Sequence, residues 1–312
     1  MAVIDSTFGA YFIGVIISAV LYGVTCVQVW FYYVSYPSDP WHIKTLVFGV
    51  FASDTVHQAL ITHSAYVYLV SDIGSATGLE DIVWSLIVEV LFNAITSLLV
   101  QSFLAMRVYR LSNKSIPITA VVMVVVIAEF VLSVIYVAKA LVFQTFAELL
   151  TLKDLSSAIN ATTAASDVLI AGCLVFLLQK SRTGFRRSDS MINKLMLFSL
   201  NTGLLTGIFA VASLISISAW PNAFIYIAFY FCLGRLYCNS LLATLNARRI
   251  IRAASTDDDM SLSLQGVNKT NVATSQRPMP NNISIKIDTT HELVRDDKPY
   301  SANGDVKALN VV

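Results

Sequence analysis

Five ionisable side chains stand inside stretches of the sequence that are otherwise apolar: Arg235, Asp54, Glu89, Glu129 and Asp167. A charged side chain in the middle of a bilayer costs about 2.5 to 3.5 kcal/mol on insertion scales, so such residues usually face a partner or a water-filled cavity and are candidates for function. A carboxylate that lacks a partner at this depth is expected to take up a proton. We therefore expect one ion pair, made by Arg235 with one of the four carboxylates, and some neutral acids.

Polar residues continue from two of these charges along helical faces. At about 100° per residue, Asn239 and Asn246 follow Arg235, and Asn93 follows Glu89. Because lipid offers no hydrogen-bond partner, these stripes should point toward neighbouring helices. Two interpretations remain open: a polar cavity for a ligand or a proton, and a polar lock that fixes how the helices pack.

A metal site is the other chemistry that the sequence suggests. Asp54, His57 and His63 lie close together in the chain, and a catalytic zinc normally takes three protein ligands. On a helical wheel the three point in different directions, so they cannot all face one metal. The sequence predicts no catalytic residue, no metal site and no cofactor, and an intramembrane enzyme is the least favoured function.

The composition indicates the elements that must position these residues. Hydrophobic residues make up 56% of the chain and charged residues 13%, whereas a typical soluble domain has roughly 25% charged residues. A helix needs about 20 mostly apolar residues to cross a bilayer. Seven segments meet or approach this length, at about 8–34, 43–70, 82–106, 118–141, 158–179, 195–218 and 222–245. They predict an all-α membrane protein, with a seven-transmembrane helix bundle in residues 1–252.

The remaining residues, 253–312, are rich in Ser, Thr, Asn and Asp. Such a composition cannot bury a core, so this segment is predicted to be a disordered cytoplasmic tail.

The Lys and Arg residues predict the orientation of the bundle. Alternate connectors and span ends carry twelve of them on one side and two on the other, which places the N terminus outside and the C terminus in the cytoplasm. The connector between spans five and six is the most basic. It could bind anionic lipid or a cytoplasmic protein, or act only as a topology signal with a helix cap at Ser188, Asp189 or Ser190. No nucleic-acid partner is expected. The basic residues of this connector are Lys180, Arg182, Arg186, Arg187 and Lys194.

Long strings of the chain resemble a known family. The strings SRTGFRRSDSMINKLMLFSLNTGLLTG (181–207) and NAFIYIAFYFCLGRLYCNSLLATLNARR (222–249) closely resemble seven-span proteins of mushroom-forming fungi, which carry a C-terminal membrane domain of unknown function. That domain corresponds to about residues 165–250, and the wider resemblance covers about 6–252. It implies a fungal, multispan membrane protein in which Arg235 belongs to the family pattern, and it implies no activity.

Two functional classes fit these features. A receptor-like sensor is favoured by seven spans, an outer N terminus, a basic cytoplasmic connector and a polar tail. The chain has MRVYR where rhodopsin-like receptors carry Asp-Arg-Tyr, and its seventh span has no lysine for a retinal Schiff base. A proton-coupled transporter or channel is the alternative, because of the mid-membrane carboxylates. Against it, the sequence shows neither a repeat between halves nor a pair of spans broken by Gly or Pro.

Overall fold

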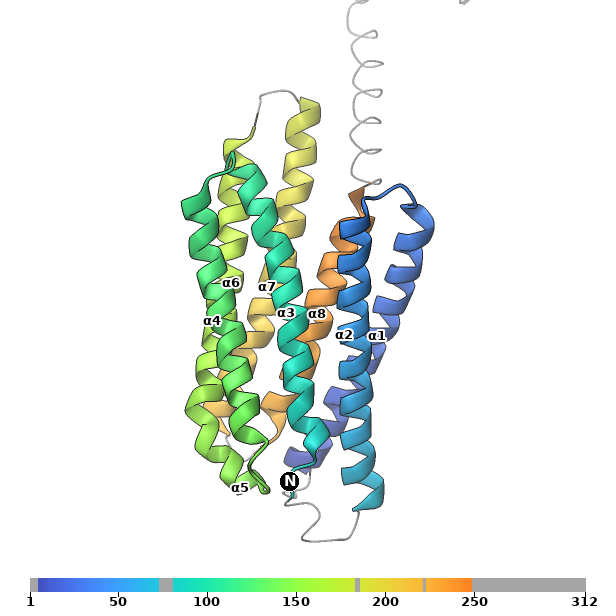
Figure 1. Ribbon diagram of the computed structural model, residues 1–312, viewed down its shortest axis with the longest axis vertical. Coiled ribbons are helices and arrows are strands. Elements are labelled where there is room, and N and C mark those ends of the chain that lie inside the picture. Colours follow the sequence, from blue (N-terminus) through green and yellow to red (C-terminus); the bar gives the residue numbers. More distant parts are fainter. Residues whose placement is uncertain (1–4, 73–80, 183–185, 221–222, 249–312) are drawn as a thin grey trace, which may run out of the picture. The chain divides into compact units, whose positions relative to one another are not determined.

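The computed structural model describes residues 5–72, 81–182, 186–220 and 223–248, and within these ranges the chain folds into seven long helices. The predicted tail, 253–312, lies outside them. The short helix α5 (Phe146–Leu149) precedes the fifth long helix (Figure 1). The long helices are α1 (Ala10–Ser35), α2 (Trp41–Tyr66), α3 (Trp84–Leu111), α4 (Ile116–Ala140), α6 (Lys153–Lys180), α7 (Arg186–Ala219) and α8 (Ile225–Asn246).

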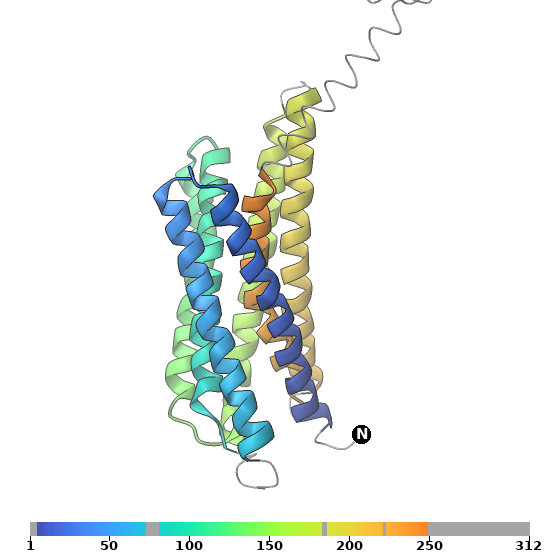
Figure 2. The same ribbon diagram turned by 90° about the vertical axis from the view of Figure 1, so that its right-hand side faces the viewer.

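The seven long helices form a closed bundle, and the chain runs alternately up and down through it (Figures 1 and 2). The order of neighbours round the bundle is α1, α2, α3, α4, α6, α7 and α8, which returns to α1. Two helices make further contacts across the bundle, because α3 also meets α6 and α8, and α8 also meets α2. We call the end where α1 begins the N-terminal end, and the end where α8 finishes the C-terminal end.

Within the described ranges, five segments are long and apolar enough to cross a membrane: Thr7–Ser35, Trp84–Leu111, Ile116–Ala140, Phe146–Lys180 and Ile225–Asn246. The protein is therefore an integral, multi-pass membrane protein. The other two long helices are more polar: α2 contains Lys44, Asp54, His57 and His63, and only Leu205–Ala219 of α7 forms a shorter apolar helix.

Polar and apolar side chains are distributed over the bundle as expected for a protein surrounded by lipid. On α4, Val124 and Ile127 are exposed, whereas Glu129 and Ser133 on the same helix are buried. On α1 the buried residues include the small Gly14, Ser18 and Thr25, and the exposed face is apolar. Apolar side chains thus cover the outer surface, and buried small or polar side chains join the apolar clusters in the contacts between helices.

Helix ends follow from local residues. Pro40 immediately precedes α2, and Pro117 is at the start of α4, where a proline costs no hydrogen bond. Between α3 and α4 the chain reverses through Asn113 and Lys114, with φ of 55° and 64°. This left-handed conformation is tolerated by asparagine and is less favourable for lysine.

The predicted spans lie on the observed helices, and three boundaries differ by five residues or more. Helix α3 continues past 106 to Leu111, α6 begins at Lys153, and α7 begins at Arg186. Residues 188–190 therefore lie within α7 and do not cap it. Helices can extend beyond the apolar stretch because charged and polar residues still form helical hydrogen bonds outside the hydrocarbon layer.

Candidate functional site

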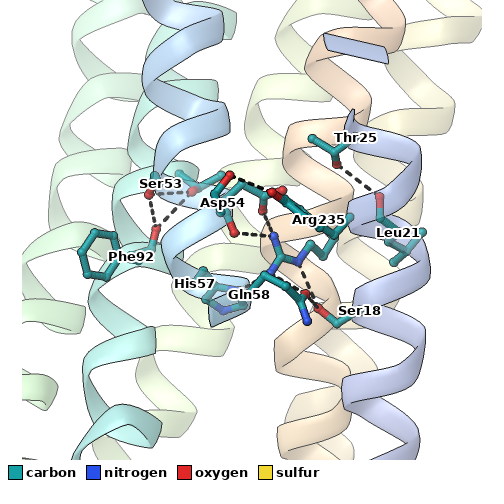
Figure 3. Close-up of polar contacts among 12 residues, drawn as sticks. Ser18, Leu21, Thr25, Ser53, Asp54, His57, Gln58, Phe92 and Arg235 are labelled. Carbon is teal, nitrogen blue, oxygen red and sulfur yellow. Dashed lines mark hydrogen bonds and ion pairs between the residues drawn. The ribbon is translucent and has the colours of Figure 1, made fainter. Parts of the chain in front are cut away.

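Arg235 is fully buried near the middle of α8, and α1 and α2 supply its partners (Figure 3). Its Nε donates to Ser18 Oγ of α1 at 3.0 Å, and its Nη1 donates to the carbonyl oxygen of Asp54 at 2.7 Å and forms an ion pair with the Asp54 carboxylate. Its Nη2 donates to His57 Nδ1 at 2.9 Å and to Gln58 Oε1 at 3.0 Å. A guanidinium has five N–H donors, so these contacts satisfy all of them.

The contact between Arg235 and His57 fixes the form of the imidazole. Because a guanidinium can only donate, His57 Nδ1 must accept, and the ring is neutral with its proton on Nε2. His57 Nε2 lies 2.7 Å from Glu89 Oε2, although the N–H is not directed along the line to this oxygen. His57 thereby stands between Arg235 and Glu89.

The two acids near Arg235, Asp54 and Glu89, differ in whether a counter-charge lies beside them. The ion pair assigns Asp54 as the partner of the arginine, and His57 is neutral. Glu89 is 2% exposed, and its one polar contact among the described residues is His57 Nε2. An ionised Glu89 would therefore have no counter-charge of its own.

Glu129 and Asp167 lie in a second cluster, on the other side of α8. Neutral groups surround Glu129, because Ser97 Oγ donates to it at 2.9 Å, Gln101 Nε2 at 3.1 Å and Ser166 Oγ at 2.9 Å. Gln101 Nε2 is also 3.4 Å from the Tyr237 hydroxyl, which donates to Asp167 Oδ2 at 2.8 Å. We call this set the Glu129–Asp167 cluster; it contains Ser97, Gln101, Glu129, Ser166, Asp167 and Tyr237.

The asparagines predicted to belong to the same network hold helices together instead. Asn239 Nδ2 donates to Leu21 O at 3.1 Å, and Asn246 Nδ2 donates to Gln28 O at 3.0 Å, so this stripe of α8 points at the backbone of α1. Asn93 Nδ2 is 3.5 Å from Tyr230 O of α8.

The polar side chains expected to form one network thus form two clusters. Several residues in these clusters were not predicted from the sequence to belong to the network. His57, Gln58 and Tyr237 all contact a predicted charge. His57 and Gln58 are three and four residues after Asp54, the spacing at which side chains share a helical face, so this signal was present. His63 lies apart from them, with its Nδ1 2.9 Å from Ser85 Oγ. Among the described residues no three His, Cys, Asp or Glu side chains group as metal ligands would.

Two small cavities flank this polar layer. One, of about 50 Å³, lies in the N-terminal half and is lined by Glu89, Asn160, Tyr136, Tyr226 and Tyr230 among others. The other, of about 30 Å³, lies in the C-terminal half, and Asp167, Tyr237 and Arg107 are among its lining residues. A water molecule needs about 10 to 15 Å³ on this measure, so each cavity has room for a few waters or one very small molecule.

At the C-terminal end, α1 and α8 are tied by an ion pair outside the membrane spans. Arg248 Nη2 lies 2.5 Å from Asp39 Oδ2, and the Tyr32 hydroxyl donates to the same oxygen at 2.9 Å. Burial raises the pKa of Asp39, but the hydrogen bonds from Arg248 and Tyr32 outweigh it and hold this pKa below its ordinary value. Beside it, the Tyr36 hydroxyl donates to Asn246 O at 2.8 Å.

Part of the basic connector lies at the same end. Lys180 and Arg182 are exposed, and Arg182 donates to Asn193 Oδ1. The side chains of Arg186, Arg187 and Lys194 lie outside the described residues.

Comparison with known proteins finds a similarity to one family, and the function of that family is unknown. Residues 163–250 match a family of unknown function, DUF6534. The matched segment spans most of α6 and all of α7 and α8, and so contains Asp167, Arg235 and Tyr237, whereas Asp54 and Glu89 lie outside it. No curated protein and no solved structure matches the chain. Residues 163–250 of the protein are therefore similar to a family whose function is unknown.

Proposed function

We propose that this chain is a seven-span, receptor-like sensor, and not an enzyme, with its N terminus outside and its C terminus in the cytoplasm. The observation that carries the proposal is the series of contacts from Glu89, in the wall of the cavity in the N-terminal half, through His57 to Arg235. Arg235 in turn joins α8 to α1 and α2. A sensor requires a ligand site and a second site whose state depends on it. The cavity is suited to the first role and the C-terminal end to the second.

The seven-span arrangement and its orientation rest on packing and charge. Helices α2 and α7 take their places in the same ring as the five apolar segments, which supports their crossing the membrane with them. Lys180, Arg182 and Arg248 lie at the C-terminal end, and an excess of basic residues favours the cytoplasmic side. The fungal origin implied by the sequence resemblance belongs to the same proposal.

Helix α8 is the element suited to carry a signal. It contains Arg235 near its middle, and Arg248, which binds Asp39, follows directly after its end. A helix of this length moves as a unit, because its backbone hydrogen bonds are internal. A shift at Arg235 would therefore strain the Asp39–Arg248 ion pair. The basic connector, at the same end, is proposed to meet anionic lipid or a cytoplasmic protein partner.

The test of this proposal measures coupling between the cavity and the C-terminal end. The exposed Ser38, in the turn after α1, is replaced by cysteine and labelled with an environment-sensitive fluorophore in protein reconstituted in nanodiscs. Glu89→Gln at the cavity wall should change the fluorescence of this label. The matched control is Glu148→Gln, which removes the same charge from an exposed site on α5, where glutamine also suits a capping box. Equal fluorescence in wild type, Glu89→Gln and the control would contradict the proposal.

Proton-coupled transport is the second candidate, and the Glu129–Asp167 cluster favours it. Its hydroxyl and amide groups link two carboxylates across α3, α4, α6 and α8, and a cavity lies on each side of the polar layer. Transport predicts that proteoliposomes carrying the protein dissipate a proton gradient, and that Asp167→Asn stops this. A gradient as stable as in protein-free liposomes would favour the sensor.

A further inference from the structure

The cavity in the N-terminal half contains two buried acceptor atoms that no hydrogen-bond donor among the described residues satisfies. These atoms are Glu89 Oε2 and Asn160 Oδ1, and their residues are 2% and 3% exposed. The orientation of the Asn160 amide is fixed, because its Nδ2 donates to Ser156 O at 3.0 Å. Asn160 Oδ1 can only accept a hydrogen bond, and Glu89 Oε2 does so when its carboxyl group is ionised. Whatever occupies the cavity beside an ionised Glu89 should therefore be a donor.

The charge at this site points to a cation. Arg235 and Asp54 neutralise each other, and His57 contributes no charge because its Nδ1 accepts from Arg235. An ionised Glu89 leaves this part of the bundle with one uncompensated negative charge, which is costly in a buried position. A monovalent cation in the cavity would remove that cost and would supply the missing donors.

The walls and the size of the cavity select among cations. The aromatic side chains of Tyr136, Tyr226 and Tyr230 line it, and aromatic faces attract organic ammonium groups. Most of the remaining lining is aliphatic, for example Leu86 and Ile159, which suits the apolar part of an organic cation better than a bare metal ion. The volume of about 50 Å³ has room for a few waters, which is enough for a small organic ammonium ion.

We propose that this cavity binds a small protonated amine, for example methylammonium, through Glu89 and Asn160. Its N–H groups donate to the two unsatisfied oxygens, and its charge balances Glu89. The inference rests on the proposed function in one respect, since it names the ligand class of the sensor. Binding itself can be measured without any signalling readout.

The experiment titrates the purified full chain, in nanodiscs, with methylammonium chloride and follows its thermal stability and the heat of binding. Ionic strength is kept constant with sodium chloride, and tetramethylammonium and potassium chlorides are the comparison salts. Methylammonium should raise Tm in a saturable manner, and the other two cations should not. Glu89→Gln should weaken binding by at least about tenfold and Asn160→Ala by a smaller factor, because hydrogen bonds to charged groups are the stronger ones. Glu148→Gln serves as the matched control and should bind like wild type.

The possible results distinguish failure of the amine site from failure of the sensor proposal. Folding of Glu89→Gln is not at risk, because the substitution keeps the shape of the side chain and removes an uncompensated charge. Saturable binding that Glu89→Gln abolishes supports the site, even if the label at position 38 does not respond, in which case only the sensor proposal fails. An absence of saturable binding, equal stabilisation by potassium, or unchanged binding in Glu89→Gln would overturn the inference and leave the cavity to water. The coupling between Glu89 and the C-terminal end would be unaffected by that result.

Discussion

Arg235 is a buried charge whose hydrogen-bond donors and counter-charge are all supplied by neighbouring helices. All five of its N–H donors have acceptors on α1 and α2, and its charge is balanced by Asp54. A group so fully satisfied has no donor left for a ligand. The structure therefore favours a structural role for Arg235 and leaves Glu89, which lies one imidazole away, as the group open to the cavity.

The Arg235–Asp54 pair gives the first prediction at this scale. Arg235→Met should lower the free energy of unfolding by about 3 to 5 kcal/mol, because it leaves Asp54 buried without its partner. Adding Asp54→Leu should recover much of this loss, since no unpaired charge then remains. Survival of the folded protein on heating, followed by size-exclusion chromatography, measures both effects.

Glu129 provides the control for this pair of substitutions. Glu129 lies in the separate Glu129–Asp167 cluster, so the cost of Glu129→Gln should add to that of Arg235→Met. The assignment of Asp54 as the partner would be wrong if the Arg235→Met, Asp54→Leu protein were no more stable than Arg235→Met alone.

At the scale of elements, the contact between α1 and α8 depends on small residues and on amides. Asn239 and Asn246 bond to the α1 backbone, and Gly14 of α1 allows the backbone of α8 to come close at Ala228. Close approach of this kind is the usual basis of helix association where lipid removes the hydrophobic driving force.

Two glycines of α1 form a matched pair for testing this contact. A Cβ at Gly14 would lie 2.6 Å from Ala228 Cα, whereas a Cβ at Gly23 would have nothing within 4 Å. Gly14→Ala should therefore destabilise the protein by about 1 to 3 kcal/mol through overpacking. Gly23→Ala should be neutral or slightly stabilising, because alanine is the better helix former. Equal thermal stability of the two variants would contradict the close contact of α1 and α8.

The elements were accessible from the sequence, whereas the partners of the charges were not. Long apolar stretches are a local signal, so each of the seven predicted spans overlaps one of the helices that formed, although α7 begins nine residues earlier than predicted. Asp54, Glu129 and Asp167 all lie near the middle of their helices, so depth alone could not select the partner of Arg235. That choice depends on which helices are neighbours and how each is rotated, and both follow from contacts far apart in the chain.

At the scale of the whole molecule, the exposed surface of the bundle is apolar and its charged side chains at mid-helix are buried. Exposed aliphatic side chains such as Val124 and Ile208 face outward, while the buried layer holds Arg235, Glu89 and Glu129. In such a bundle lipid offers no hydrogen-bond partner, so most buried polar groups bond to another helix or to the backbone of their own. The more polar α2 supplies Asp54, His57 and Gln58 to this layer, which explains why it can stand in the ring without a strongly apolar sequence.

The last prediction tests the orientation and whether α2 crosses the membrane. Ser38 follows α1 at the C-terminal end, and Gln144 follows α4 at the N-terminal end; both are exposed. If α2, α3 and α4 all cross, these positions are on opposite sides. With an impermeant maleimide on intact cells, Gln144→Cys should react at once and Ser38→Cys only after permeabilisation, with the unsubstituted chain as control for the native cysteines. Reaction of both variants from the same side would mean that α2 does not cross, because two crossings then separate them, and labelling with the sides exchanged would mean that the bundle is inverted.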